Sequence, residues 1–250
     1  MSDDAQTPTV DARFYGRRRG KRLKAGQAAL METLYPRLRL PRAAADPYGK
    51  GELEAGVVLD PRAFFARPVR AVWLEIGFGG GEHMAAQAAA NPDVGFVGAE
   101  PFVNGIGKLL SKIDDQGLDN IRLYGDDVRP FLDHLPDACL DKVFLLFPDP
   151  WPKARHAQRR FINPANLDAV ARLLVDGGEF RVASDDMTYV RWTLRHVPVH
   201  PAFRWTARGP SDWRTRWADA IESRYEAKGR RCGRVPKYLQ FIRRPRGTEG

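Results

Sequence analysis

Five short apolar runs, each followed by a segment with helical spacing, constrain the fold of this chain more than any other feature. The runs span residues 69–76, 94–99, 121–124, 143–147 and 179–183. Strands that alternate with helices at this spacing predict right-handed crossovers and a parallel sheet covered on both faces. Two later apolar runs, at 203–207 and 235–242, predict late edge strands that could form a hairpin. The expected class is therefore α/β.

An acidic side chain stands at the end of each of the first five runs. These acids are Glu75, Glu100, Asp127, Asp149 and Asp185. Because the carboxyl ends of parallel strands meet at one edge of a sheet, we expect the five carboxylates to lie close together. Like charges repel, so such a cluster gains no stability by itself. It predicts a ligand that carries many hydrogen-bond donors and a positive charge.

The first strand runs into a glycine-rich turn, EIGFGGG, at residues 75–81. Glycines at a strand-to-helix turn let a ligand approach the backbone closely, and we expect Gly77 and Gly79 to bind a cofactor. A dinucleotide fingerprint needs a third glycine where this chain has Glu82, which argues against an NAD-dependent dehydrogenase. The pattern favours a cofactor without phosphate, S-adenosylmethionine. Glu100, about twenty residues on, is placed to accept both ribose hydroxyls.

The fourth run continues into VFLLFPDPWPKARHAQRR, residues 143–160. Pro148 and Pro150 cannot donate ladder hydrogen bonds and favour extended neighbours, so Asp149 and Trp151 should sit in a stiff loop. Trp151 could stack on a base or only brace that loop. Basic residues follow at once from Lys153 onward. An acid, a flat ring and a basic patch together predict a binding site for a nucleobase that is carried on a polyanion.

The charge of the whole chain supports an anionic partner. The net charge is +9 and the isoelectric point is about 9.8, with basic clusters near both ends. Nucleic acid is favoured over a membrane because no basic amphipathic helix stands out, although solvated surface charge alone could also give this excess. No apolar run has the length of a membrane span and no signal peptide begins the chain, so we expect a cytoplasmic protein. Cys139 and Cys232 have no metal-ligand spacing and predict reduced thiols, with no metal site.

Four segments resemble the bacterial tRNA (guanine-N7-)-methyltransferase family. They are LEIGFGGG, FPDPWPKARHAQRR, the ASD at 183–185 and the SRYE at 223–226, and the resemblance covers residues 13–244. It implies a Rossmann-like class I methyltransferase fold: a mostly parallel seven-stranded sheet, helices on both faces and a late antiparallel edge strand. It also implies that S-adenosylmethionine methylates N7 of the guanine at position 46 in the variable loop of tRNA.

The resemblance assigns roles to particular residues. The cofactor would be contacted by Glu75, Gly77, Gly79, Glu100, Asp127 and Asp149, and Asp149 would also be the catalytic residue. The substrate would be bound by Lys153, Asp185, Ser223, Arg224, Tyr225 and Glu226. The RNA-interacting segment would consist of Arg155, His156, Ala157, Gln158, Arg159 and Arg160.

The chain departs from the family pattern at a few positions. Ser223 stands where Thr is usual, which keeps the hydroxyl, and Val128 stands where Ala is common. Asp126 precedes Asp127, so either acid could face the adenine, and an ungapped count from Asn120 favours Asp127. Three histidines, His83, His134 and His196, fall at helical or helix-start positions and are expected to be packing or surface residues.

The organisation along the chain follows from these segments. We expect a flexible basic arm over 1–25, a helix and docked connector over 26–68, the methyltransferase domain over 69–244 and a tail over 245–250. The first helix should end at Pro36. No obligatory protein partner is implied, and the oligomeric state is open. Two other functions stay open, a methyltransferase for another RNA base and a noncatalytic RNA-binding protein on the same fold.

Overall fold

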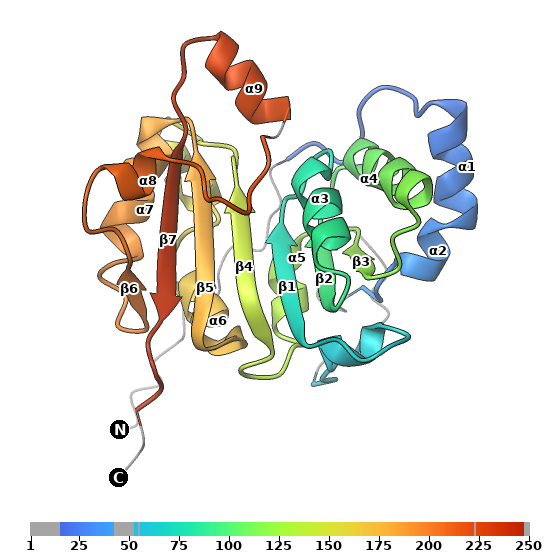
Figure 1. Cartoon of the computed structure of the whole chain (residues 1–250), viewed down its shortest axis with the longest axis horizontal. Coiled ribbons are helices and arrows are strands. Elements are labelled where there is room, and N and C mark those ends of the chain that lie inside the picture. Colours follow the sequence, from blue (N-terminus) through green and yellow to red (C-terminus); the bar gives the residue numbers. More distant parts are fainter. Residues whose placement is uncertain (1–15, 43–52, 55, 223, 248–250) are drawn as a thin grey trace, which may run out of the picture.

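The protein is built on one seven-stranded sheet with the order β3-β2-β1-β4-β5-β7-β6 (Figure 1). The computed structural model describes residues 16–42, 53–54, 56–222 and 224–247. The strands are β1 Ala71–Ile76, β2 Val94–Ala99, β3 Ile121–Tyr124, β4 Leu140–Leu146, β5 Leu174–Ser184, β6 Phe203–Trp205 and β7 Lys237–Arg243. Strands β1 to β5 are parallel, whereas β7 runs antiparallel to β5 and β6. The predicted fold class is confirmed, with the short β6 at the edge beside the late antiparallel strand.

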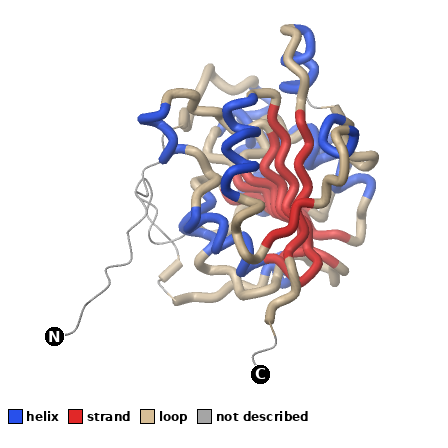
Figure 2. Tube along the Cα trace, turned by 90° about the vertical axis from the view of Figure 1, so that its left-hand side faces the viewer, coloured by secondary structure: helices blue, strands red, loops and turns tan. Residues whose placement is uncertain are grey.

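Helices cover both faces of the sheet, which Figure 2 shows in a view turned by 90°. The helices are α1 Ala25–Thr33, α2 Tyr35–Leu38, η1 Pro61–Phe64, α3 Glu82–Ala90, α4 Val103–Gln116, α5 Val128–Leu132, η2 Ala154–Arg159, α6 Pro164–Leu173, α7 Met187–His196, α8 Ser211–Arg214 and α9 Arg224–Arg231. Helices α3 and α4 pack on one face, and α5, α6 and α7 pack on the other. Such two-sided cover explains why every residue of β1 and β2 is buried.

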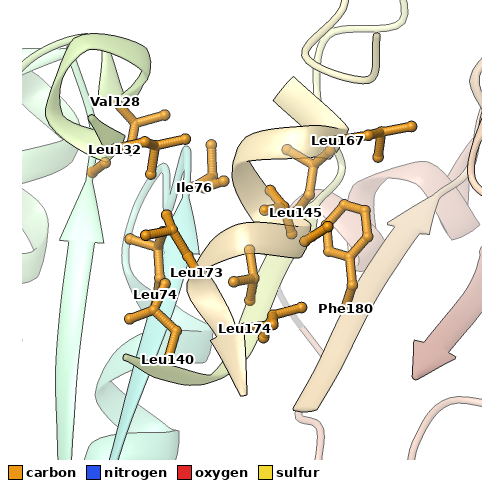
Figure 3. Close-up of a cluster of buried hydrophobic side chains, with 14 of the residues drawn as sticks. Leu74, Ile76, Val128, Leu132, Leu140, Leu145, Leu167, Leu173, Leu174 and Phe180 are labelled. Carbon is orange, nitrogen blue, oxygen red and sulfur yellow. The ribbon is translucent and has the colours of Figure 1, made fainter. Parts of the chain in front are cut away.

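The two faces carry separate apolar cores because side chains alternate along each strand. Leu74 and Ile76 of β1 enter the core under α5 and α6, where Figure 3 shows them beside Leu145 of β4. Trp73 of the same strand enters the other core, against Phe96 of β2 at a ring distance of 5.3 Å. This division leaves the carboxyl ends of β1, β2 and β4 free to form a site.

Several predicted element boundaries differ from the structure, among them the end of the first helix and the start of the fifth strand. Pro36 does not end the first helix; α1 ends at Thr33, and Pro36 lies at the start of α2, where its missing N–H is not needed. Strand β5 begins at Leu174 instead of Glu179, because the exposed Asp176 and Gly177 interrupt its apolar pattern. Neither difference moves the carboxyl ends of the strands.

The N-terminal segment from residue 16 to 24 lies along α4. The backbone N–H of Gly20 donates to Asn104 Oδ1 at 2.8 Å, and Asn104 Nδ2 donates to the carbonyl of Lys21 at 2.6 Å. Residues 1–15 of the predicted flexible arm, and 43–52 of the predicted connector, lie outside the described residues. Within the described ranges, no helix combines the length and apolar character that a membrane span requires.

Candidate active site

A cavity of about 650 Å³ opens at the carboxyl ends of β1, β2 and β4. Its walls come from the glycine loop after β1, the turns after β2 and β3, the loop after β4, and residues 217–226. Figure 1 places α9 beyond this end of the sheet. Gly16 and Arg17 of the N-terminal segment also line the cavity. The location and size are those expected for a ligand site in an α/β sheet.

The glycine loop turns β1 sharply into α3. Gly77, Gly79 and Gly81 have φ angles of 69°, 57° and 69°, in the left-handed region that favours glycine. Helix α4 packs directly against the loop, since a Cβ on Gly105 would lie 2.4 Å from the carbonyl oxygen of Gly79. Gly77 and Gly79 both line the cavity, so the loop offers bare backbone to a ligand, and cofactor binding by these two glycines stays a prediction.

Glu100, directly after β2, is held by two backbone donors. Its Oε2 accepts from the N–H of Gly79 at 2.7 Å and its Oε1 from the N–H of Phe102 at 2.9 Å. Burial raises the pKa of Glu100 to about 7, and the two backbone hydrogen bonds oppose that rise. Each oxygen keeps a further lone pair, so the fixed carboxylate can accept from two vicinal hydroxyls. This fits the ribose of S-adenosylmethionine.

Both acids after β3 line the cavity. Asp127 caps α5, because its side chain accepts from the N–H of Arg129 at 3.1 Å, and it also pairs with the Arg129 guanidinium. Asp126 is fully buried and pairs with Arg18 from the N-terminal segment. Sequence reasoning missed Arg18, which is 108 residues away from its partner.

Glu75 has a partner that sequence reasoning also missed. His83 Nδ1 in the first turn of α3 lies 2.8 Å from Glu75 Oε2, and both side chains are buried. Both residues line the cavity. His83 was expected to be only a packing or surface residue. The signal that could have found it was its place one turn into the helix that follows the acid's strand.

The loop after β4 is rigid and strained. Phe147 and Trp151 have φ angles of 50° and 41°, which cost of order 1–3 kcal/mol each for non-glycine residues. Arg160 holds the loop, because its Nε donates to the carbonyl of Pro150 at 3.0 Å and its Nη2 to that of Trp151 at 2.7 Å. Arg160, predicted to contact RNA, is therefore buried inside the protein and over the ring of Trp192.

Asp149 is presented at the tip of this loop. Its side chain is exposed at the cavity wall and forms no hydrogen bond or ion pair with a described residue. Trp151 also lines the cavity, with the Arg159 guanidinium 4.8 Å from its ring centre and His156 edge-on at 5.9 Å. Lys153 and Arg155 are exposed just beyond. The loop thus combines a free carboxylate, an indole and cations in one place.

Two other predicted substrate residues already have partners within the protein. Asp185 lies 3.2 Å from the Nε of Arg234. Glu226 is buried, accepts from Arg216 Nε at 3.0 Å and is also bonded to the hydroxyl of Tyr238. Of the other predicted residues, Ser223 lies outside the described part of the chain, and Arg224 and Tyr225 begin α9.

The segment that carries Glu226 is anchored to the sheet by Asp219. Arg181 Nη1 on β5 donates to both carboxylate oxygens of Asp219 at 2.8 Å. Desolvation alone would raise the pKa of Asp219, but this interaction helps to keep it below its ordinary value. Gln87 of α3 also bonds the Asp219 carbonyl. This anchor holds Trp217 and Ile221 at the cavity wall.

The rest of the predicted RNA-interacting segment forms η2. Arg155 and Gln158 are exposed, while His156, Ala157 and Arg159 are half-buried. Desolvation, together with repulsion from the neighbouring cations, lowers the pKa of His156. Across the described residues there is no group of three or more His, Cys, Asp or Glu side chains that could hold a metal ion.

The sequence is similar to those of known methyltransferases. The family described as "Putative methyltransferase" matches residues 69–237. A tRNA (guanine-N(7)-)-methyltransferase of Rhodospirillum rubrum is 62% identical over 98% of this chain and 92% of its own. One of Chelativorans is 48% identical over 92% of this chain and 94% of its own. Among solved structures, an rRNA methylase from Streptococcus thermophilus is 12% identical, covers 70% of this chain and 87% of its own, and has a TM-score of 0.48.

Proposed function

The chain belongs to the tRNA (guanine-N(7)-)-methyltransferase family, and we propose that it methylates N7 of the guanine at position 46 in the variable loop of tRNA. One observation carries this proposal. A cavity with buried, hydrogen-bonded carboxylates at one end has the exposed Asp149 and a cationic segment at the other. The buried end suits a small cationic cofactor, and the exposed end suits a base on a polyanion.

The methyl donor of the enzyme is S-adenosylmethionine, which supplies an electrophilic methyl group on a sulfonium. Glu100 would hold the ribose, and Gly77 and Gly79 would bring backbone groups up to the ligand. Asp126 and Asp127 would border the adenine, with Asp127 capping α5 and Asp126 holding the N-terminal segment. Glu75 would contact the amino-acid end. The positions of these side chains around the cavity support the proposed roles.

Asp149 would act on the base. N7 of guanine carries a lone pair and no proton at neutral pH, so its attack on a methyl group needs no strong general base. Alignment of the two reactants can contribute on the order of 7 to 11 kcal/mol. The transfer leaves a positive charge on the purine, which a fixed carboxylate stabilises as it develops. A carboxylate with no partner among the described residues can also accept from the N–H edge of guanine.

The exposed cations would bind the RNA. Lys153 and Arg155 would neutralise phosphates near the target base, which gives an affinity that falls with salt and reads the shape of the tRNA. Trp151 would brace this loop, because Arg159 already stacks on its ring. The tRNA is the partner that this function requires. We propose that the enzyme acts in the cytoplasm without an obligatory protein partner.

The test is methyl transfer from labelled S-adenosylmethionine to two unmodified tRNA transcripts. One transcript carries guanine at position 46, and in its matched control that guanine is replaced by adenine. We expect label to appear as 7-methylguanosine in the first transcript alone. Label in the control at a similar level would overturn the proposed position. Methylation of a different atom, found by nucleoside analysis, would overturn the proposed product.

A further inference from the structure

A buried histidine stands behind the cofactor end of the cavity, and the mechanism above does not use it. His83 Nδ1 faces Glu75 Oε2 at 2.8 Å. An ionised carboxylate only accepts, so Nδ1 carries the proton and donates it in this hydrogen bond. The other nitrogen, Nε2, is buried without a partner in the described structure, and the ring lies edge-on to Phe144 at 4.9 Å. Among the described residues, the ring therefore makes one polar contact, with the carboxylate of Glu75.

Holding one oxygen of a carboxylate fixes its rotation. The last side-chain torsion of Glu75 has broad, roughly two-fold energy minima. The side chain alone therefore does not set the plane of its two oxygens. With Oε2 held by His83, the plane is set and Oε1 remains for a ligand. Since both residues line the cavity, the fixed carboxylate borders the ligand space.

The other acids of the cavity indicate which part of the cofactor this carboxylate meets. Glu100 is held in place to accept from the two ribose hydroxyls, and the acids after β3 border the adenine of the cofactor. Asp149 lies at the side of the cavity where the target guanine would bind. The α-ammonium of the methionine part has three donors and a positive charge, and an oriented carboxylate is its strongest partner.

We propose that His83 is a positioning residue, which orients Glu75 to bind the α-ammonium of S-adenosylmethionine. This inference rests on the proposed function, because it takes the cofactor from it. His83 does not contact the reacting atoms. It acts on affinity for the amino-acid end of the ligand and leaves the nucleoside end unaffected.

Three substitutions separate positioning from packing. His83→Leu removes the donor and keeps an apolar body of similar size. His83→Asn keeps an N–H donor near the place of Nδ1, whereas His83→Gln moves its amide toward the place of Nε2. The matched control is His134→Leu. His134 is also buried, and its Nδ1 lies 2.8 Å from the carbonyl oxygen of Val57, but His134 does not line the cavity.

The readout is calorimetric binding of two ligands to each full-length variant. S-adenosylhomocysteine contains the α-ammonium, and 5′-methylthioadenosine lacks the whole amino-acid end. We expect His83→Leu and His83→Gln to lower the affinity for S-adenosylhomocysteine by roughly 10- to 100-fold, as for a lost charge-assisted hydrogen bond. Binding of methylthioadenosine should change by less than about twofold, and His83→Asn should retain most of the wild-type affinity. His134→Leu should lower the melting temperature without changing either affinity.

Several outcomes would overturn the inference. An equal loss of affinity for both ligands would assign His83 to packing. So would an Asn variant that binds S-adenosylhomocysteine as weakly as the Leu variant does. Unchanged binding in all three variants would remove any role. If the Leu variant does not fold, the Asn and Gln pair decides. Wild-type protein that binds S-adenosylhomocysteine but leaves tRNA unmethylated would contradict the proposed function and leave the His83 comparison valid.

Discussion

The two ends of the cavity are built in opposite ways. At the cofactor end, Glu75, Glu100, Asp126 and Asp127 are buried, and each is hydrogen-bonded to a histidine, an arginine or backbone N–H groups. At the RNA end, Asp149, Lys153 and Arg155 are exposed and unpaired with described residues. The cofactor end is preorganised by folding, whereas the RNA end leaves its charges for the ligand to pair.

The contrast has an energetic cause. A buried carboxylate costs several kcal/mol unless it is hydrogen-bonded, so the cofactor end cannot keep its acids without partners from the fold. An exposed charge is hydrated and needs none. Substitutions at the cofactor end should therefore change stability and ligand affinity together. Substitutions at the RNA end should change catalysis or RNA binding while leaving stability alone.

The largest effect should come from Asp149→Ala at the exposed end. Loss of one preorganised electrostatic group costs roughly 10²- to 10³-fold in kcat. The melting temperature should stay within about 1 °C of wild type, because the side chain is exposed and has no partner in the described part of the chain. Single-turnover methyl transfer with saturating tRNA measures the first quantity, and calorimetry measures the second. A large loss of stability would break the division between the two ends.

Glu100→Gln should give the next largest effect, in the dependence of stability on pH. The folded-state pKa of Glu100 is raised from 4.5 to about 7, so the protonated acid is favoured on folding. The stability that this provides is fully present below pH 4.5 and is lost as the pH rises to 7. The loss amounts to about 3 kcal/mol in the ligand-free protein.

Urea unfolding of wild type and Glu100→Gln at pH 5 and pH 8 measures this loss. Between these values the stability of wild type should fall by roughly 2 kcal/mol more than that of the variant. Only the change between the two pH values is informative, since the glutamine also disturbs the bonds from Gly79 and Phe102. Parallel pH profiles would show that the carboxylate is solvated.

Gly105→Ala should have a smaller effect, again at the buried end. The new methyl group would meet the carbonyl oxygen of Gly79 at 2.4 Å, which pushes α4 from the glycine loop. We expect a loss of about 2 kcal/mol in stability and about tenfold in affinity for S-adenosylhomocysteine. The matched control is Gly26→Ala in α1, where a Cβ meets nothing within 4 Å and should slightly stabilise the helix.

The smallest effects should come from Lys153→Ala and Arg155→Ala. Each should reduce the slope of log K against log salt for tRNA binding by about one, with no change in stability or in cofactor affinity. Filter binding across a salt series measures the slope. Arg67→Ala is the control, because Arg67 pairs with Asp119 near the starts of β1 and β3, far from the cavity. A similar slope change in the control would indicate general charge attraction.

The sequence predicted the buried end of the site less completely than the fold. The strands and their terminal acids were readable because alternation, glycine and proline are local signals. The partners of acids that lie far away in the sequence were not readable. Arg18 reaches Asp126 across 108 residues, and Arg181 reaches Asp219 across 38, and no periodic pattern marks either pair. The exposed tip at Asp149 was readable because prolines and a strand end fix it locally.

The position of β7 bears on how the protein is made. Strand β7, at Lys237–Arg243, pairs on one side with β5 and on the other with β6. The ribosome completes β5 at Ser184 and synthesises its neighbour roughly sixty residues later. At 5 to 20 residues per second, the nascent chain therefore carries an open, unpaired strand edge for roughly 3 to 12 seconds. During translation, this edge of β5 therefore stays open to pairing with other chains until residue 243 has emerged.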